Sequence, residues 1–324
     1  SSGNPEAVRL LVKAGSDVNA TETGRGQTPL AFAAAFNHPE TIQILLRNGA
    51  DVNKKGKLRS AAQRPTRRRQ GQQQLQERKS TAPGGNPRGK LTPLMYAARE
   101  GHIEAGRALI EGGANLNEVS ADQSTALLVA TINGNFDVAK FLLEEGADVT
   151  IASMDGATPL FGVVNIQWAP KTDTPQPTLK YEKTHYLDLL QSVLNSGADP
   201  NTRTKKELWY TRNREGTSSA GITPFWRCAS VGDVDCMRLL IAYGADPNIA
   251  NTDGITPLLI AAGAGFHGNN ELTTPTGRLA TVKYLVEQLQ ADVNRSDTAE
   301  GSARNDTMNT SRFAGGFTAL HHAA

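Results

Sequence analysis

The sequence has few of the features that mark membrane, disulfide-rich or catalytic proteins. It contains only two cysteines in 324 residues, which excludes a framework of several disulfides. No apolar run approaches the roughly 20 residues that a membrane-spanning helix needs. Glycine-rich phosphate loops, nucleophile elbows and the paired histidines of zinc proteases are also missing. Hydrophobic residues make up 38% of the chain, which is ordinary for a folded protein. We therefore expect a folded chain with no cofactor and no catalytic centre of its own.

One short phrase recurs seven times: Thr, then Pro or Ala, then Leu or Phe. Its threonines are Thr28, Thr92, Thr125, Thr158, Thr223, Thr256 and Thr318. They step by 64, 33, 33, 65, 33 and 62 residues, which is a period of 33 or that period enlarged by 29 to 32 residues. A second phrase, Gly-Ala-Asp-Val-Asn or a close variant, also recurs seven times, for example at Gly49 and Gly244. Similarity at a fixed period indicates a repeat architecture.

Each unit carries the signals of two helices joined by a turn. The threonine hydroxyl can cap a helix, and proline at the first helical position loses no needed N–H. Phe141-Leu142-Leu143 and Leu239-Leu240-Ile241 have the core spacing of a second helix, and the glycine after it suits a left-handed C-cap. A 33-residue period opened by Thr-Pro-Leu resembles the ankyrin repeat. The resemblance predicts an all-α ankyrin-repeat solenoid of stacked helix-turn-helix units with extended finger loops.

The phrases divide the chain into a single solenoid with partial repeats at both ends. Repeats are expected to start near residues 26, 90, 123, 156, 221 and 254. Residues 3–19 match only a second helix and residues 316–324 only a first helix, so we expect the natural polypeptide to extend in both directions. The extra residues should form insertions at 54–86, 203–218 and 295–312 in the fingers, and at 165–183 and 264–276 in the turns between paired helices.

The net charge of +2 hides a strong separation of charge along the chain. Residues 54–90, here called the basic finger, hold twelve Lys or Arg residues and one acid, Glu77, which gives +11 and leaves −9 for the rest. Its lack of aromatic residues argues against a packed core. The polyanion-binding candidates are Lys54, Lys55, Arg64, Arg67, Arg68, Arg69, Arg78 and Lys79. The basic finger could fold back on the acidic body, dock an acidic protein, or bind nucleic acid or an anionic surface, and we favour a protein over nucleic acid.

The resemblance implies that a protein partner binds the fingers and the exposed side of the first helices. The aligned candidates are Gln27, Phe36, Arg99, Glu100, Ile132, Asn133 and Ile222, with Asn165 and Val231 at equivalent positions. Phe36, Ile132 and Ile222 are the expected exposed apolar members, although some of these residues could pack between repeats instead. Trp209 and Tyr210, beside arginines in the second lengthened finger, have the composition of an interface anchor. Packing of Trp209 against a neighbouring finger is the alternative.

The histidines and cysteines have structural interpretations. His38, His102 and His321 occupy positions where the family that the chain resembles uses histidine structurally, and the adjacent pair His321-His322 is a poor chelate, so no metal site is predicted. Cys228 and Cys236 are expected to face the core as small apolar side chains. The sequence does not decide whether they form a disulfide.

These observations lead to one main function and two alternatives. We expect a protein–protein interaction scaffold or assembly subunit that carries out no catalysis within this chain. The alternatives are polyanion binding through residues 54–90 and a non-catalytic module of a longer enzyme. The phrasing around Glu207-Leu208-Trp209-Tyr210 resembles long-insert ankyrin proteins of environmental bacteria, many of them exported, which favours a bacterial periplasmic or extracellular location.

Overall fold

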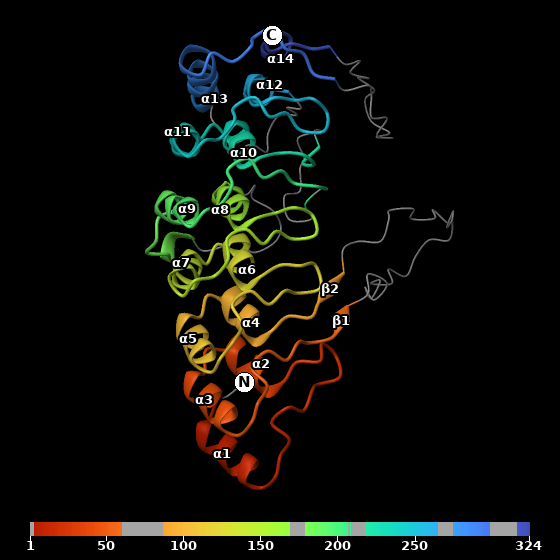
Figure 1. The fold of residues 1–324 in the computed structure, drawn as a ribbon, viewed down its shortest axis with the longest axis vertical. Coiled ribbons are helices and arrows are strands. Elements are labelled where there is room, and N and C mark those ends of the chain that lie inside the picture. The colour runs from red at the N-terminus through yellow and green to blue at the C-terminus, as the bar shows by residue number, and fades with distance from the viewer. Residues whose placement is uncertain are drawn as a thin grey trace, which may run out of the picture. The chain divides into compact units, whose positions relative to one another are not determined.

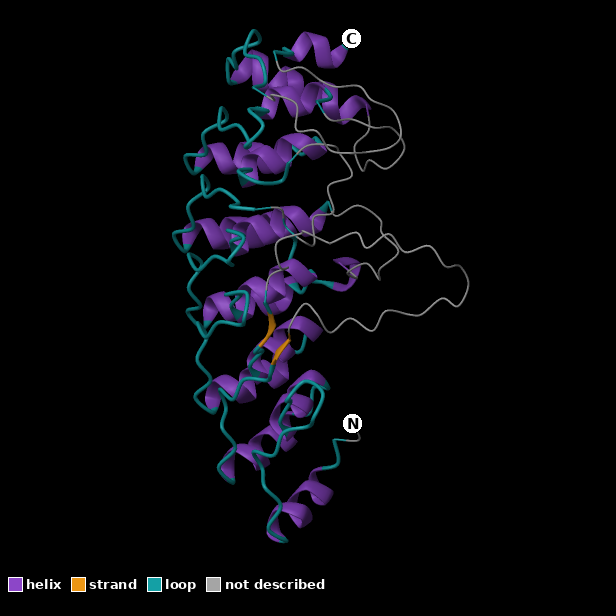
Figure 2. Cartoon of the chain, turned by 90° about the vertical axis from the view of Figure 1, so that its right-hand side faces the viewer, coloured by secondary structure: helices purple, strands orange, loops and turns teal. Residues whose placement is uncertain are grey.

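Helices dominate the structure. The computed structural model describes residues 3–59, 87–168, 179–206, 208, 218–264, 275–298 and 316–324. The chain divides into two compact units, Ser1–Ala126 and Leu127–Ala324. Figure 1 labels the helices, and Figure 2 colours them purple; the strands among the described residues are the short β1 (Leu58–Arg59) and β2 (Arg88–Gly89). The predicted all-α repeat fold is confirmed.

Unit 1 stacks its helices in two layers. The helices are α1 (Pro5–Lys13), α2 (Pro29–Ala35), α3 (Pro39–Arg47), α4 (Pro93–Glu100) and α5 (Ile103–Glu111). The first helices α2 and α4 pack on each other, the second helices α1, α3 and α5 form the other layer, and each first helix also packs on its own second helix. Leu30, Ile42, Leu94 and Leu109 lie between the layers and are at most 2% exposed.

Unit 2 repeats this arrangement. Its elements are α6 (Ala126–Asn133), α7 (Phe136–Glu144), α8 (Pro159–Gln167), η2 (Leu179–Tyr181), α9 (Tyr186–Asn195), α10 (Pro224–Val231), α11 (Val234–Ala242), α12 (Pro257–Ala262), α13 (Pro275–Lys283), the π-helical turn η3 (Tyr284–Gln288) and α14 (Ala319–Ala323). The first helices α8, α10, α12 and α14 pack in series, and so do the second helices α7, α9, α11 and α13. Large aromatic side chains, including Phe161, Phe225 and Trp226, fill the core at no more than 1% exposure.

Local sequence signals set the helix boundaries. The hydroxyls of Thr28, Thr92, Thr158, Thr223 and Thr256 accept hydrogen bonds from the N–H three residues on, at 3.1–3.3 Å, and proline follows each of them. These contacts confirm the predicted helix starts. After the second helix the chain turns through a left-handed residue, such as Gly49 with φ 84°. Gln290 takes the same role with φ 53°, a region that favours glycine.

Asparagine side chains connect successive fingers. In unit 1, Asn19 Nδ2 donates to the carbonyl oxygen of Gly49 at 3.0 Å, and Asn19 Oδ1 accepts the N–H of Asp51 at 2.8 Å. In unit 2, Asn201 makes the same two bonds to Gly244 and Asp246, at 2.9 and 2.8 Å. One side chain thus satisfies both a donor and an acceptor of the next finger, which fixes the spacing of the fingers.

Candidate functional site

Two exposed aromatic side chains of unit 1 lie on α2 and at its C-terminal end. Phe32 and Phe36 are 38% and 50% exposed, and their separation of four residues places them on one face of the helix. The ring of Phe36 stacks on His38, with the centroids 6.5 Å apart. Gln27, which precedes the cap Thr28, is half-buried. The structure therefore keeps Phe36 exposed as expected and adds Phe32, which the sequence reasoning did not select.

Charged side chains lie at the end of the neighbouring helix α4. Arg99 and Glu100 form an ion pair of 2.6 Å, and the guanidinium of Arg99 lies over the ring of Tyr96, 4.9 Å from its centroid. Because α2 packs on α4, the predicted residues Gln27, Phe36, Arg99 and Glu100 all belong to one pair of adjacent helices. With Phe32 they are called the α2–α4 surface below.

A hollow adjoins this surface. It has a volume of about 570 Å³, and its lining includes Val8 and Leu11 of α1, Phe32 of α2, Leu45 of α3, and Glu22 and Gln27 of the first finger. The backbone N–H of Gln27, followed by those of Arg25 and Gly24, lowers the pKa of Glu22, so that side chain stays ionised at the polar rim. An apolar wall with a charged rim suits an apolar side chain or a short helix of a partner.

The candidates in unit 2 are less accessible than expected. Ile132 and Asn133 are half-buried, and Asn133 Nδ2 donates to the carbonyl oxygen of Val129 at 2.8 Å. The exposure predicted for Ile222 is wrong, because its side chain is only 2% exposed. Ile222 exchanges two hydrogen bonds of 3.0 Å with Thr204, which draws it into the lengthened finger.

Two other positions aligned with the predicted binding residues are also less exposed than expected. Asn165 is 3% exposed and Val231 is 8% exposed, so both belong to the interior of unit 2. Trp209 and Tyr210 lie outside the described residues. Their predicted role as anchors stays a prediction.

The basic finger begins and ends in a two-stranded ribbon. In antiparallel register, Leu58 pairs with Gly89, and Arg59 pairs with Arg88. Lys54 is half-buried, and Lys55 forms an ion pair of 2.6 Å with Glu118, whose pKa it lowers by donating a hydrogen bond to the carboxylate. The remaining polyanion candidates, Arg64, Arg67, Arg68, Arg69, Arg78 and Lys79, lie outside the described residues.

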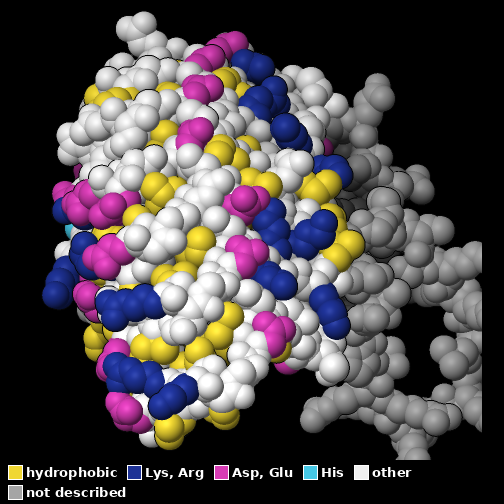
Figure 3. Space-filling view, turned by 60° about the horizontal axis from the view of Figure 1, so that its bottom comes forward, with side chains coloured by type: hydrophobic (Ala, Val, Ile, Leu, Met, Phe, Trp, Pro, Cys, Tyr) yellow, Lys and Arg dark blue, Asp and Glu magenta, His cyan; other side chains and the backbone are white. Residues whose placement is uncertain are grey.

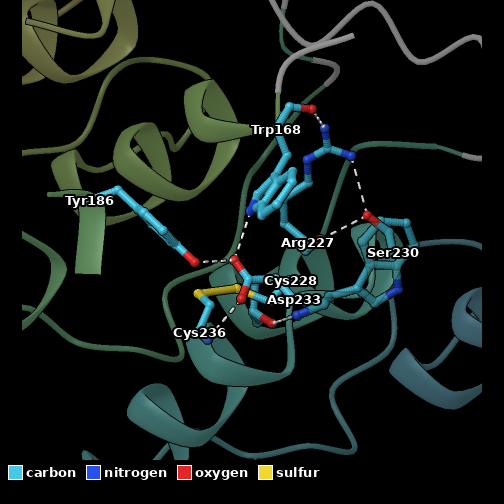
Figure 4. The surroundings of a disulfide bond; sticks show 9 residues. Trp168, Tyr186, Arg227, Cys228, Ser230, Asp233 and Cys236 are labelled. Carbon is cyan, nitrogen blue, oxygen red and sulfur yellow. Dashed lines mark hydrogen bonds between the residues drawn. A yellow bond between two sulfur atoms is a disulfide. The ribbon is translucent and has the colours of Figure 1, made fainter. Parts of the chain in front are cut away.

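A disulfide joins the two helices of one repeat in unit 2. Cys228 of α10 and Cys236 of α11 are bonded, with their Cα atoms 6.2 Å apart, and both side chains are 0% exposed. The predicted burial of both cysteines is confirmed. The structure also decides the question that the sequence left open, in favour of a bond between them (Figure 4).

Asp233 lies at the centre of the surrounding contacts. Figure 4 shows Trp168 and Tyr186 both pointing toward its carboxylate: Oδ2 accepts from Trp168 Nε1 at 2.7 Å and from the Tyr186 hydroxyl at 2.9 Å. Its Oδ1 caps α11 by accepting the N–H of Cys236 at 3.0 Å. Burial, followed by the negative charge of Asp233, raises the pKa of Tyr186. Trp168 thus acts as a packing anchor within unit 2.

A buried arginine completes this group. Arg227 is 4% exposed, and its guanidinium donates to the carbonyl oxygen of Trp168 and to Ser230 Oγ, each at 3.2 Å. Asp233, Tyr186, Trp168, Arg227 and the disulfide are called the Asp233 cluster below. The sequence reasoning missed Asp233 and Tyr186. The available signal was the position of Asp233 directly before a second helix, where a carboxylate makes a good cap.

A second carboxylate anchors the other end of the turn between α8 and α9. Asp137, at the start of α7, accepts the N–H of Lys183 at 3.1 Å and both the N–H and the hydroxyl of Thr184 at 2.8 and 2.7 Å. Burial opposes the charge of Asp137, but these hydrogen bonds outweigh it and hold its pKa below the usual value. Glu182 Oε2 accepts the N–H of Asp137 at 2.7 Å, and burial raises the pKa of Glu182. The contacts of Asp137 and Asp233 therefore fix this turn and indicate a structural role for both.

The described part of the chain shows neither a metal-binding cluster nor a membrane-spanning helix. The described residues contain no group of three His, Cys, Asp or Glu side chains that could hold a metal ion. Across the same residues, no helix has the length and apolar content to cross a membrane. His38 and His102 precede α3 and α5, and His321 Nδ1 lies 2.8 Å from the hydroxyl of Thr318, in line with structural roles.

Comparison with known proteins identifies the repeats. The family model for ankyrin repeats (3 copies) matches residues 1–65, 70–153, 181–297 and 226–324. These ranges cover most of the chain, so the chain belongs to the ankyrin repeat family, whose repeats are generally protein–protein interaction modules and are typically not enzymes.

One curated relative matches a short stretch. Ankyrin repeat and SOCS box protein 12 of Mus musculus is 38% identical over 65 residues, which is 20% of this chain and 20% of that protein. The chain thus spans about a fifth of the length of this relative. The match supports the assignment of ankyrin repeats to this stretch. It does not show that this chain shares the activity of the whole relative.

Proposed function

We propose that this chain is a protein-binding scaffold and that its α2–α4 surface is a principal contact for the partner. The observation that carries the proposal is the exposed pair Phe32 and Phe36 beside the apolar hollow of unit 1. Aromatic side chains are enriched in the centre of protein interfaces, where burying them contributes most of the binding energy. Two such side chains on one helix face, next to a hollow, offer a partner an anchoring site.

The charged end of α4 supplies selectivity. The ion pair of Arg99 and Glu100 is exposed, so it contributes little to folding and can rearrange when a partner binds. A partner that presents an acid to Arg99 and a hydrogen-bond donor to Glu100 gains both contacts. A partner with the opposite arrangement meets repulsion.

The test removes the aromatic anchors and keeps the fold. The variant Phe32→Ser/Phe36→Ser and the control Leu279→Ser, which alters a leucine of α13 that is 56% exposed, would be used for affinity capture from an extract of the source organism. We expect the wild-type chain and the control to capture the same stoichiometric protein and the double variant to lose it.

The captured protein would then be purified and its affinity measured by calorimetry. We expect the double variant to bind it at least about tenfold more weakly, with an unchanged helical circular dichroism spectrum. Equal affinity for the wild-type chain and the double variant would place the contact elsewhere and refute the role of the α2–α4 surface.

A further inference from the structure

The base of the basic finger concentrates positive charge on three adjacent backbone segments. The N–H of Lys57 donates to the carbonyl oxygen of Arg25 at 2.7 Å, and the N–H of Lys90 donates to the carbonyl oxygen of Lys57 at 3.1 Å. Segments bonded in this way lie about 4.8 Å apart. Arg25, Lys57 and Lys90 are all exposed, so three cations follow one another across the segments.

Backbone hydrogen bonding also places two like charges side by side. The N–H of Lys90 donates to the carbonyl oxygen of Lys57, so these two lysines lie next to each other at the end of the ribbon. Like charges held side by side across a sheet are destabilising. An anion bound between them would remove that cost.

The acids near this charge offset it only in part. Glu118 forms its ion pair with Lys55, and Glu22, whose carboxylate accepts the backbone N–H groups of Gly24, Arg25 and Gln27, keeps its negative charge. Asp122 follows Ala121, whose N–H donates to the carbonyl oxygen of Gly89. Segments 54–59 and 87–91 contain no acid. Among the described residues, no ion pair involves Arg25, Lys54, Lys57 or Lys90, and Lys57 Nζ donates to the carbonyl oxygen of Thr23 at 3.1 Å. A net positive charge is therefore left for a ligand.

The surface composition indicates which anion fits. Leu58, 55% exposed, is the large apolar side chain that the described ribbon presents to solvent, whereas a protein interface needs an apolar or aromatic centre. Residues 54–90 contain no aromatic residue on which a single-stranded base could stack. Figure 3 shows Lys and Arg side chains gathered on the right-hand part of the viewed face, with Asp and Glu side chains beside them. A charged surface with little apolar area suits the phosphates of a nucleic acid better than a protein partner.

We propose that Arg25, Lys54, Lys57 and Lys90 form a site that binds the phosphate backbone of a double-stranded nucleic acid without reading its sequence. The ribbon supplies the charge density, and the charge of −9 outside residues 54–90 repels the polyanion and directs it to this site. The sequence alone favoured an acidic protein as the partner of the basic finger. The structure reverses this preference, because the register of the ribbon and the scarcity of apolar surface on it are seen only there. The assignment does not depend on the α2–α4 surface.

The test measures the salt dependence of duplex binding. Fluorescence anisotropy with a short mixed-sequence duplex DNA would compare the full chain with the variant Arg25→Gln/Lys54→Gln/Lys57→Gln/Lys90→Gln across a series of salt concentrations. We expect the variant to bind at least about tenfold more weakly at low salt. The slope of log affinity against log salt should become shallower by up to about 3.6, since each of four phosphate contacts contributes about 0.9.

A matched control separates a local site from general charge. The variant Lys13→Gln/Arg47→Gln/Lys140→Gln/Lys283→Gln removes the same charge from exposed positions on second helices and should bind as the wild type does. Phe32→Ser/Phe36→Ser should also bind duplex normally, so failure here is distinguishable from failure of the proposed scaffold function. Circular dichroism would confirm the helical content of each variant.

Three results would overturn the proposal. The first is equal affinity and slope for the wild type and the Arg25/Lys54/Lys57/Lys90 variant, and the second is an equal loss in the control variant. The third is displacement of the duplex by poly-glutamate or by vesicles rich in phosphatidylserine at equal charge concentration, which would assign the surface to an acidic protein segment or to a membrane.

Discussion

The base of the basic finger and the Asp233 cluster both bring together segments that are far apart in the sequence. The Asp233 cluster satisfies its charge with internal hydrogen bonds, whereas Lys57 and Lys90 form no ion pair among the described residues. At Asp233, a buried carboxylate receives three donors from three different elements. At the ribbon, the N–H of Lys90 donates to the carbonyl oxygen of Lys57, and neither segment contains an acid. A charge that is satisfied inside the chain indicates a structural role, because partners would only disturb it. A charge that the chain leaves uncompensated indicates a ligand.

The Asp233 cluster offers the largest expected effect. Asp233→Ala removes the acceptor of Trp168 Nε1, the Tyr186 hydroxyl and the Cys236 N–H, so buried donors lose their partner and α11 loses its cap. We expect the free energy of unfolding to fall by about 3 to 5 kcal/mol in urea titrations followed by tryptophan fluorescence. Asp235→Ala, at an exposed position of the same helix, is the control and should cost less than about 1 kcal/mol. A small effect at Asp233 would remove the contrast between the two regions.

The disulfide should contribute the next largest effect. Cys228 and Cys236 are eight residues apart, and closing so short a loop stabilises the fold by about 2.5 kcal/mol in the chain-entropy treatment. A reductant should therefore lower the free energy of unfolding of the wild type by that amount. It should leave Cys228→Ala/Cys236→Ala unchanged. A wild type insensitive to reductant under unfolding conditions would show that the bond does not stabilise the Asp233 cluster.

Tyr186 makes the same region sensitive to alkaline pH. Burial and the charge of Asp233 keep its hydroxyl protonated in the folded chain at a pH where the unfolded chain ionises. The unfolded state then binds fewer protons, so the free energy of unfolding falls as the pH rises above about 10. Tyr186→Phe should cost about 1 kcal/mol at neutral pH and flatten this alkaline decline. Thermal unfolding across pH would measure both, and an equally steep decline in the variant would contradict the assignment.

A charge reversal in the ribbon should raise the stability of the chain, in contrast to the changes around Asp233. Lys90→Glu replaces a like-charge pair with an opposite-charge pair beside Lys57, so we expect stability to rise by about 0.5 kcal/mol while duplex affinity falls. Lys13→Glu, at an exposed position in the last turn of α1, is the control for duplex affinity and should leave it unchanged. Its reversed charge at the helix C-terminus should itself lower stability by roughly 0.5 kcal/mol. A loss of stability in Lys90→Glu would show that repulsion across the ribbon is not relieved in this way.

Much of the fold could be predicted from the sequence because its determinants are local. A Thr hydroxyl that caps the N–H three residues later, and a glycine after the second helix, act within one turn of chain. These signals recur with a fixed period, so the helix pairs follow from them. Phe36 was predicted correctly as exposed from its position directly after the first helix of a repeat.

The rest depended on contacts between residues far apart in sequence. Ile222 is buried because Thr204, in a lengthened finger, pairs with its backbone. The bond from Trp168 to Asp233 spans 65 residues and crosses the insertion at residues 165–183. The hydrogen bond from Lys90 to Lys57 likewise requires the two ends of the basic finger to meet. Repeat periodicity carries no information on any of these three contacts.

Hydrogen–deuterium exchange of the full chain, with and without saturating duplex DNA, tests the central contrast most directly. We predict that duplex slows exchange at residues 54–59 and 87–91 and leaves residues 224–242, around the Asp233 cluster, unchanged. Slowed exchange confined to residues 224–242, or no change at the ribbon under saturating duplex, would contradict the account.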